Sequence, residues 1–368
     1  MKIFIDINHP AHVHYFKNII KRLQNKGHSF VITARDKEMA HDLLNNLNYE
    51  FYSRGKGAEG FIKRIVYTIK ADLQLYKLAL KEKPDLFLSY SSPYCAHTSS
   101  LVGKPHIAFD DTENATFMRM LYKPFSDIVL TPKCFRKDLG SQQIRFTSYM
   151  ELSYLHPKIF QPNKSIYNYL GIEIGKPYVI IRFVAWRATH DIGHKGISLE
   201  NKMNAVRTFS EWAHIFISSE AELPDELKKY KLNIPKHMIH DALAFSSMYY
   251  GESATMASES AILGVPAIYI DNVGRGYTHE QESKYGLVFN FTESKADQLE
   301  SIKKGVEILQ IPKSNWEAKR EKLLRENIDL TPFIEYFIEN YPESIEVMKK
   351  NPGYQERFKM CEPRYVVR

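Results

Sequence analysis

The sequence predicts an α/β protein with two doubly wound parallel sheets, one after the other along the chain. Three observations favour this fold class. Short apolar strands alternate with helix-length segments, the alternation restarts near residue 178, and 368 residues exceed the length of one ordinary core. Ligands of such sheets bind beyond the carboxyl ends of the strands. We therefore expect the functional site in the cleft between two Rossmann-like domains that face each other.

The first half of the chain contains the first series of elements. An amphipathic helix is expected over residues 12–26, ending at Gly27, and a second, long helical pattern runs up to Lys83. Residues 156–165, rich in proline and polar side chains, indicate a linker. The expected strands are 2–7, 29–34, 85–90, 106–111, 126–132 and 144–149.

The second half repeats the same alternation of strands and helices. The expected strands are 178–186, 214–220, 266–271 and 287–291, and the expected helices are near 200–212, 241–250 and 296–309. We predict an N-terminal Rossmann-like domain over 1–160 and a C-terminal Rossmann-like domain over 161–331. A helical, Tyr-rich segment over 332–368 is expected to cross back and pack on the N-terminal domain.

Composition and charge limit the classes of function. No stretch approaches the about 20 apolar residues of a membrane helix, and the start reaches an Asp too early for a secretory signal, so we expect a cytoplasmic protein. Three scattered cysteines argue against a structural zinc site. The formal charge of +7, with many basic residues before residue 65, could attract a phosphorylated substrate, a nucleic acid or an anionic membrane. Nucleic acid is disfavoured because no recognised binding motif accompanies the charge.

Residues 249–271 carry the most informative motif. A turn of small residues opens a helix there, Glu259 lies one turn inside it, and Gly264 leads into an apolar strand. Backbone N–H groups at a helix start attract an anion such as a phosphate, and a carboxylate one turn away can accept two sugar hydroxyls. The motif suits a nucleotide. The alternative is an ordinary strand-turn-helix-strand unit whose Glu is merely solvated.

The loop after the first strand contains His9, His12 and His14. Zinc sites add a further ligand at helical or hairpin spacing, and none is evident, so we predict no metal. One of these imidazoles could instead act as a general base or donate to a phosphate oxygen. The alternative for His9 and for His14 is a helix cap.

Three acidic residues, Asp110, Asp111 and Glu113, follow the strand that begins at residue 106. Their mutual repulsion is expected to raise at least one pKa towards the range useful for acid or base catalysis. The alternative is a helix N-cap with Glu in the first turn.

Two further loops contain cationic side chains. Arg187 and His190 follow the first strand of the second half, where they could clamp a pyrophosphate. Arg275 follows the strand after the Glu259 helix, beside any nucleotide bound there.

These motifs resemble known families. Residues 251–271 resemble the nucleotide-sugar motif of GT-B-fold enzymes. Residues 8–33 are similar to the first loop and helix of the lipid II glycosyltransferase of peptidoglycan synthesis, although its glycine-rich loop is replaced here by Asn-His-Pro-Ala. Almost the whole chain resembles a bacterial and archaeal family of unknown function, number 354, through residues 106–117, 148–160 and 255–264.

The resemblance implies roles for particular side chains. Glu259 would bind the ribose, and His12 would face the sugar. The contacts to phosphate would come from the start of the helix, at Ser253, Ala254, Thr255 and Met256.

The resemblance also supports a rival, the non-hydrolysing UDP-N-acetylglucosamine 2-epimerases. They share the two-domain fold and the ribose Glu, and they have acidic residues after a strand where this chain has Asp110, Asp111 and Glu113. Their phosphate loop is only loosely similar to residues 187–190, and their N-terminal loop is absent.

The sequence therefore predicts a metal-independent, inverting GT-B-type glycosyltransferase that uses a nucleotide-diphosphate sugar, with UDP favoured, and needs no cofactor. His12 or an acid of residues 110–113 would deprotonate the acceptor, while the helix dipole and Arg187 stabilise the departing diphosphate. The alternatives are an epimerase and a non-catalytic binder of nucleotide sugars or nucleic acid. The sequence does not identify the acceptor. For a lipid-linked or glycan acceptor of cell-envelope polysaccharide synthesis, we expect peripheral contact with the inner face of the membrane. Residues 117–125 would make that contact.

Overall fold

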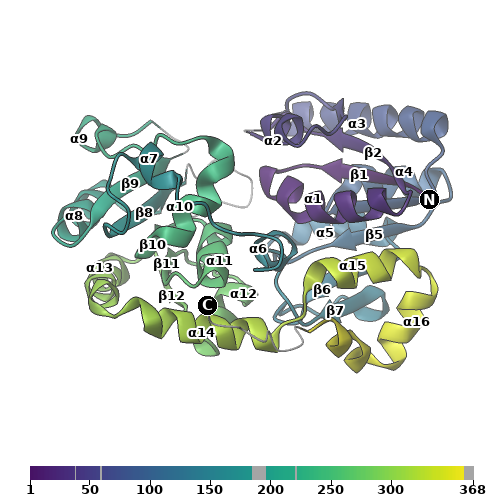
Figure 1. The fold of residues 1–368 in the computed structure, drawn as a ribbon. Coiled ribbons are helices and arrows are strands. Elements are labelled where there is room, and N and C mark those ends of the chain that lie inside the picture. Colours follow the sequence, from purple (N-terminus) through teal and green to yellow (C-terminus); the bar gives the residue numbers. More distant parts are fainter. Residues whose placement is uncertain (38, 59, 185–195, 220–221, 360–368) are drawn as a thin grey trace. The chain divides into compact units, whose positions relative to one another are not determined.

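The computed structural model describes residues 1–37, 39–58, 60–184, 196–219 and 222–359. The chain folds into two compact units, each built on one parallel sheet (Figure 1). Unit 1 comprises Met1–Tyr154 together with the segment that begins at Ile328, and unit 2 comprises Leu155–Asn327. The predicted boundaries at residues 160 and 331 lie a few residues further along the chain. Each unit is described by itself below.

Unit 1 contains a seven-stranded parallel sheet in the order β3-β2-β1-β4-β5-β6-β7. The strands are β1 (Lys2–Ile7), β2 (Ser29–Ala34), β3 (Tyr52–Ser53), β4 (Leu86–Tyr90), β5 (His106–Phe109), β6 (Ile128–Pro132) and β7 (Gln143–Phe146). The helices and 3-10 turns are α1 (Pro10–Asn25), α2 (Ala40–Asn46), α3 (Phe61–Glu82), α4 (Pro93–Leu101), α5 (Thr116–Tyr122), η1 (Lys123–Phe125), η2 (Gly140–Gln142), α6 (Leu152–Leu155, which reaches the unit boundary), α15 (Leu330–Glu339), α16 (Glu343–Lys350) and η5 (Pro352–Phe358).

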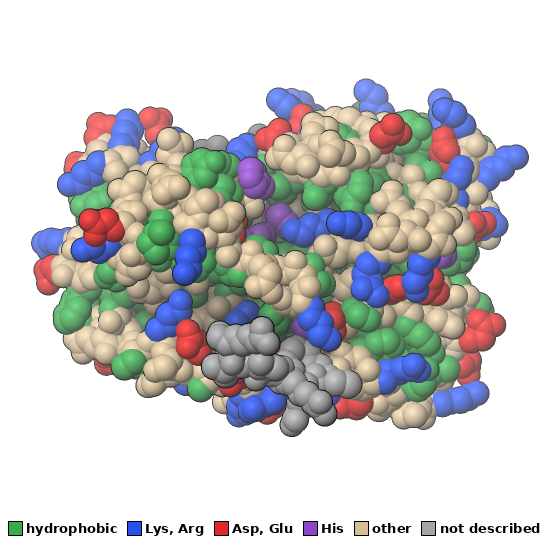
Figure 2. All heavy atoms as spheres, viewed as in Figure 1, with side chains coloured by type: hydrophobic (Ala, Val, Ile, Leu, Met, Phe, Trp, Pro, Cys, Tyr) green, Lys and Arg blue, Asp and Glu red, His purple; other side chains and the backbone are tan. Residues whose placement is uncertain are grey.

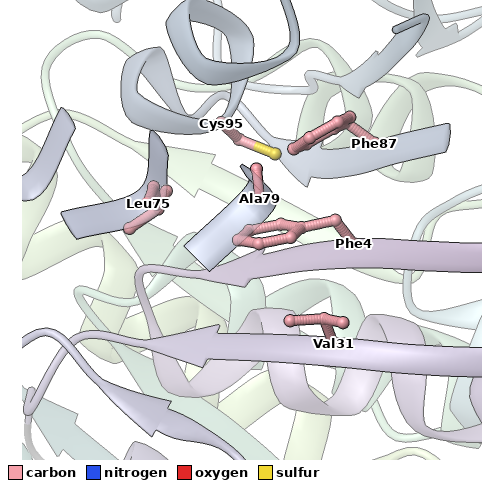
Figure 3. Packing of buried hydrophobic residues seen from close by; sticks show 6 residues of the cluster. All are labelled: Phe4, Val31, Leu75, Ala79, Phe87 and Cys95. Atoms are coloured by element: carbon pink, nitrogen blue, oxygen red, sulfur yellow. The ribbon is translucent and has the colours of Figure 1, made fainter. Parts of the chain in front are cut away.

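The order of the strands reverses between β1 and β4, so the topological switch point of unit 1 lies between the carboxyl ends of these two strands. Helix α1 packs against both α2 and α15, while α3, α4 and α5 form a second layer in which α4 contacts both neighbours. Figure 3 shows the core beneath that second layer, where Phe4 stacks on Phe87 with ring centroids 5.0 Å apart and Leu75, Ala79 and Cys95 close over them.

Unit 2 contains a five-stranded parallel sheet in the order β12-β11-β10-β8-β9. The strands are β8 (Tyr178–Phe183), β9 (His214–Ser219), β10 (Met248–Gly251), β11 (Ala267–Ile270) and β12 (Val288–Phe291). The helices and 3-10 turn are α7 (Ile166–Leu170), α8 (Leu199–Ser210), α9 (Asp225–Lys228), η4 (Lys236–Met238), α10 (Ile239–Phe245), α11 (Ala254–Leu263), α12 (Gly276–Ser283), α13 (Lys295–Gln310) and α14 (Lys313–Glu326). The switch point lies between β8 and β10.

The predicted fold class is confirmed: both sheets are parallel and alternate with helices. One predicted element is wrong. The helix expected near 241–250 ends at Phe245, and residues 248–251 form the central strand β10. Met248, Tyr249 and Tyr250 are fully buried there. A short apolar run cannot be assigned to helix or strand from periodicity alone, and its position beside β8 decides the outcome.

Two of the early basic residues pair with the C-terminal segment of unit 1. Arg22 of α1 and Lys26, the C-cap of that helix, both pair with Glu335 of α15, and Lys26 also pairs with Glu339. Figure 2 shows Lys and Arg side chains interspersed with Asp and Glu over the face in view. Within the described ranges, no helix is both long and apolar enough to cross a membrane.

Gly251 ends β10 at the switch point of unit 2, and backbone of the neighbouring strand passes directly over it. A Cβ added there would lie 2.4 Å from the carbonyl oxygen of Arg182 and 2.9 Å from its amide nitrogen. Neither backbone atom can rotate aside as the end of a side chain would, so only glycine lets β8 and β10 approach this closely.

We predict that Gly251→Ala lowers the free energy of unfolding by about 2 kcal/mol, because the added methyl forces the two strands apart. Urea denaturation followed by circular dichroism measures it. Gly353→Ala is the control, since its nearest neighbour is the end of a side chain at 3.4 Å. Equal effects of the two substitutions would contradict the close approach.

Candidate functional site

The start of α11 forms the carboxyl-edge site of unit 2. Ser253 caps the helix: its backbone is extended, and its hydroxyl accepts a hydrogen bond from the amide of Met256 at 3.4 Å. Ser253, Thr255 and Met256 are partly exposed, and Ala254 is buried against the body of the unit. The first turn of α11 therefore presents backbone N–H groups at the switch point, where the helix dipole favours an anion.

Glu259 lies one turn further along α11 and is not a solvated side chain. It is 5% exposed, and its Oε1 lies 2.9 Å from Nε2 of His240 on α10. His240 is buried as well, with its ring edge-on to Phe160. The solvated-Glu interpretation is therefore wrong: this carboxylate is held in a fixed orientation by a buried imidazole, which no sequence pattern identified.

Glu252 is a second residue that sequence reasoning missed. Its carboxylate accepts hydrogen bonds from the backbone amides of Val184 at 2.7 Å and of Ile197 at 2.5 Å. The Glu252 side chain therefore anchors the backbone just after β8 and again just before α8. The predicted phosphate ligands Arg187 and His190 fall between these two points, outside the described residues, so their roles stay predictions.

Arg275 lies at the start of α12, after the strand that neighbours β10. Its Nη1 donates to the carbonyl of Gly274 at 2.7 Å and lies 3.9 Å from Asp271 Oδ1. Asp271 in turn accepts from the amides of Val273 and Gly274. The guanidinium therefore sits in a tight turn at the same carboxyl edge as the start of α11.

In unit 1, a buried ion pair organises the carboxyl end of β1. Asp6 and Arg54 both have fully buried side chains, and Arg54 Nε lies 2.9 Å from Asp6 Oδ1. Asp6 also accepts from the hydroxyls of Thr33 and Ser92, and Arg54 donates to the side chain of Asn8. These bonds fix the loop that leads into α1 at the switch point.

The three histidines of that loop have separate surroundings. His9 caps α1 by accepting from the amide of Ala11 at 3.2 Å, so the cap interpretation is confirmed for it. His14 lies inside α1 with its ring stacked on Tyr154, so the cap interpretation is wrong for it. Among the described residues, no three His, Cys, Asp or Glu side chains gather as metal ligands would.

His12 is buried in the first turn of α1, and its Nδ1 accepts from the amide of Asn8 at 3.3 Å. Burial, followed by the positive charges of Lys37 and Arg54, lowers the pKa of His12 to about 3. The ring is therefore neutral at pH 7. Because Nδ1 accepts, the proton resides on Nε2, and the ring acts as a hydrogen-bond donor rather than as a strong base.

The acidic cluster after β5 divides into different roles. Asp110 pairs with Arg119 at 2.9 Å and accepts from the hydroxyl of Tyr122 at 2.6 Å, so it anchors α5. Glu113 accepts from the backbone amide of Arg136 at 3.2 Å. Helix α5 begins at Thr116 without a side-chain cap, so the capping interpretation of this cluster is wrong.

Asp111 and His12 both interact with Tyr90 at the end of β4, Asp111 with its hydroxyl and His12 with its ring. The rings of His12 and Tyr90 have centroids 4.7 Å apart. Burial raises the pKa of Asp111 to about 6; the Tyr90 hydroxyl partly offsets this effect, and the charge of Asp110 adds to it. The raised pKa was expected, but burial rather than repulsion within the cluster is its largest cause.

The two parallel sheets with their interleaved helices define the GT-B fold. UDP-N-acetylglucosamine 2-epimerase of Neisseria meningitidis bound to UDP-GlcNAc is similar to this chain with a TM-score of 0.68 and 13% identity, over 92% of this chain and all of that one. MurG of Acinetobacter baumannii gives a TM-score of 0.58 and 12% identity, over 92% and 99%. At these identities the likeness establishes the shared fold.

The chain belongs to the family described as "Protein of unknown function (DUF354)", whose model matches residues 1–273. A relative in Methanocaldococcus jannaschii, an uncharacterized protein, is 23% identical over 279 residues, which cover 73% of this chain and 81% of the relative. Solved structures with this fold include UDP-N-acetylglucosamine 2-epimerases and a glycosyltransferase.

We predict that Asp111→Asn stabilises the protein at pH 8 on the order of 2 kcal/mol and leaves stability at pH 4 nearly unchanged. The native pKa of Asp111, about 6, lies above the value near 4 of an unfolded chain. Protonated Asp111 therefore contributes its full stabilisation of the folded protein below pH 4, and this stabilisation is lost as the pH rises through 6. Thermal unfolding at a series of pH values measures it.

The matched control is Asp110→Asn, which leaves the buried guanidinium of Arg119 without its carboxylate and is expected to destabilise the protein at pH 8. A destabilised Asp111→Asn at pH 8, or an effect that does not vary with pH, would contradict the assignment of Asp111.

Proposed function

We propose that this protein is a GT-B-type glycosyltransferase that binds a nucleotide-diphosphate sugar, with UDP as the favoured nucleotide, through the first two turns of α11. The observation that carries the proposal is the buried Glu259 held by His240, one turn inside a helix that starts at a topological switch point. A fixed carboxylate beside a helix start accepts two ribose hydroxyls while the backbone amides of that turn bind the diphosphate.

Burial of Glu259 makes this recognition selective. A carboxylate that is 5% exposed interacts strongly with a polar group that reaches it, because little water weakens the contact. The His240 imidazole lies on one oxygen at 2.9 Å and limits rotation of the carboxylate. Ribose hydroxyls meet an acceptor that is already oriented, so little side-chain entropy is lost on binding.

In unit 1 we assign Asp111 as the general base for the acceptor hydroxyl. Its pKa of about 6 is close to neutral pH, where a base is both deprotonated and effective, whereas the pKa of about 3 makes His12 a weak base. His12 would instead donate from Nε2 to an oxygen of the sugar or acceptor. In-line attack of the deprotonated hydroxyl on the anomeric carbon expels the nucleoside diphosphate with inversion.

The leaving diphosphate would be stabilised by the α11 dipole, by Arg275 at the same edge of the sheet, and by Arg187 and His190, whose involvement rests on the sequence. A lipid-linked or glycan acceptor is part of the same proposal. No metal or cofactor is assigned a step.

A UDP-N-acetylglucosamine 2-epimerase is the second candidate. The observation that favours it is the pair of neighbouring buried acids, Asp110 and Asp111, both with raised pKa. One acid of such a pair can take the proton from the sugar C2 while the nucleotide leaves C1, and the other acid can deliver a proton to the opposite face of C2 while the nucleotide adds back to C1. The fold of the Neisseria enzyme, bound to UDP-GlcNAc, is compatible with this alternative.

We predict that Glu259→Gln weakens UDP binding about tenfold to a hundredfold, because an amide replaces a charged acceptor of two hydroxyl hydrogen bonds. Isothermal titration with UDP and with 2′,3′-dideoxy-UDP measures it. The wild type should prefer UDP by the same factor, and Glu259→Gln should not discriminate.

The matched control is Ser260→Ala, the next residue of α11, whose buried hydroxyl donates to the Met256 carbonyl of the same helix at 2.7 Å. It should bind UDP as the wild type does. A folded Glu259→Gln that keeps wild-type UDP affinity would remove the ribose role.

We predict that UDP-N-acetylglucosamine incubated with the enzyme alone keeps its stereochemistry at C2, apart from slow hydrolysis to UDP and the free sugar. Proton NMR in D2O follows both the stereochemistry and any deuterium at C2. Asp111→Asn should abolish the hydrolysis without changing UDP affinity. Accumulation of the C2 epimer with deuterium incorporation would identify an epimerase instead. If no nucleotide sugar is hydrolysed or epimerised, the protein would be a non-catalytic binder.

A further inference from the structure

The exposed apolar side chains of this protein concentrate on one helical layer of unit 1. Of the 21 large hydrophobic residues that are exposed in the described part of the chain, ten lie on α3, α4, α5 and η1, so the clustering is not a scatter of single residues. They are Ile65, Val66, Ile69, Leu73, Leu80, Leu101, Phe117, Met118, Met120 and Phe125. We call this set the apolar layer face.

The helices of this layer are joined through His97 of α4. Its Nδ1 lies 3.1 Å from Asp72 on α3, and its Nε2 lies 3.1 Å from the carbonyl of Leu121 on α5. The ring also meets Phe125 edge-on, with centroids 4.8 Å apart. Helix α4 thus spaces α3 from α5 and η1, and the side of α3 that carries Asp72 is the side towards α5.

The exposed side of α3 is divided into two stripes. Successive residues of a helix are rotated by about 100° around its axis. The side chains of Ile65, Ile69, Leu73 and Leu80 therefore lie within one quarter of the helix circumference, and this stripe begins next to Asp72. The next strip of the helix surface, further from α4, carries exposed lysines that recur every seven residues: Lys63, Lys70 and Lys77. The apolar stripe therefore lies on the α5 side of the helix and is bordered by a row of positive charges.

The charge around the apolar layer face has one sign. Helix α3 has two acidic residues, Asp72 and Glu82, and they pair with His97 and Lys2. Helix α5 contains no acidic residue, and Phe117 and Met120 on it are 69% and 68% exposed. A protein partner would need acidic side chains opposite the lysine row as well as an apolar surface. An anionic lipid bilayer offers both, since its headgroups attract the lysines and its acyl chains accept the apolar side chains.

We propose that the apolar layer face docks on an anionic lipid bilayer. Ile65, Ile69 and Leu73 of α3, with Phe117 and Met120 of α5, enter the boundary between headgroups and acyl chains, and Lys63, Lys70 and Lys77 contact anionic headgroups. The docking deepens the membrane contact that the sequence predicts at residues 117–125. It uses no residue of the α11 site and neither His12 nor Asp111, so it can be tested separately from the proposed chemistry.

The experiment is co-sedimentation of the full chain with vesicles of phosphatidylcholine alone or with 30% phosphatidylglycerol, about a third anionic lipid. We expect binding to the anionic vesicles that weakens at least about tenfold in high salt, and little binding to neutral ones. The variant Ile65→Ser/Ile69→Ser/Leu73→Ser and the variant Lys63→Gln/Lys70→Gln/Lys77→Gln should each lose at least about tenfold in partition coefficient. All six side chains are exposed, so both variants should fold.

Two controls test whether the position on the layer matters. Ile174→Ser/Leu199→Ser removes two exposed apolar side chains of unit 2 and should leave vesicle binding unchanged. Phe117→Trp should show a blue-shifted emission that brominated lipids quench, and Tyr169→Trp, exposed on unit 2, should show neither.

The proposal is overturned if the wild type does not bind anionic vesicles, or if the isoleucine and leucine variant binds as the wild type does. A dimer in sedimentation velocity that this variant dissociates, with no vesicle binding, would assign the face to a second copy of the chain. UDP affinity of all variants, measured in parallel, keeps failure of the docking separate from failure of the proposed function.

Discussion

The geometry of unit 1 depends on one fully buried ion pair, Asp6 with Arg54. Removing two charges from water is costly, so the pair persists only because Thr33, Ser92 and Asn8 complete its hydrogen bonds. Those partners come from β2, from the start of α4 and from the loop after β1. One carboxylate thereby fixes the three segments that surround the switch point. Asn8, held in this network, then supplies the backbone amide that sets the tautomer of His12.

Burial is the common cause of the unusual chemistry on both sheets. In unit 1 the same loss of water lowers the pKa of His12 to about 3 and raises the pKa of Asp111 to about 6. In unit 2 burial gives Glu259 a fixed partner instead of a hydration shell. Gly251 at the end of β10 lets the backbone of β8 approach closely. Each unit thus has buried polar side chains at the carboxyl edge of its sheet, held by different elements of the same fold.

Periodicity and apolar runs predicted most of the strands, because parallel strands buried on both faces have almost no other pattern. The same signal failed at residues 248–250, where helix and strand look alike over three residues. The α11 motif could be predicted because a helix start, a Glu one turn on and a closing Gly are local. His240, Arg54 and Tyr90 could not, since each reaches its partner only through the fold. Asp6 is a charged residue in an otherwise apolar strand, which indicates a buried partner of opposite charge. Nothing in the sequence identifies Arg54 as that partner.

Glu252 holds the chain at Val184 and again at Ile197, on the two oxygens of a single carboxylate. Two backbone positions that are separated along the chain therefore depend on the same side chain. Replacing Glu252 by alanine would remove this acceptor from both amides at once, so the exit from β8 and the approach to α8 are coupled through a single anchor.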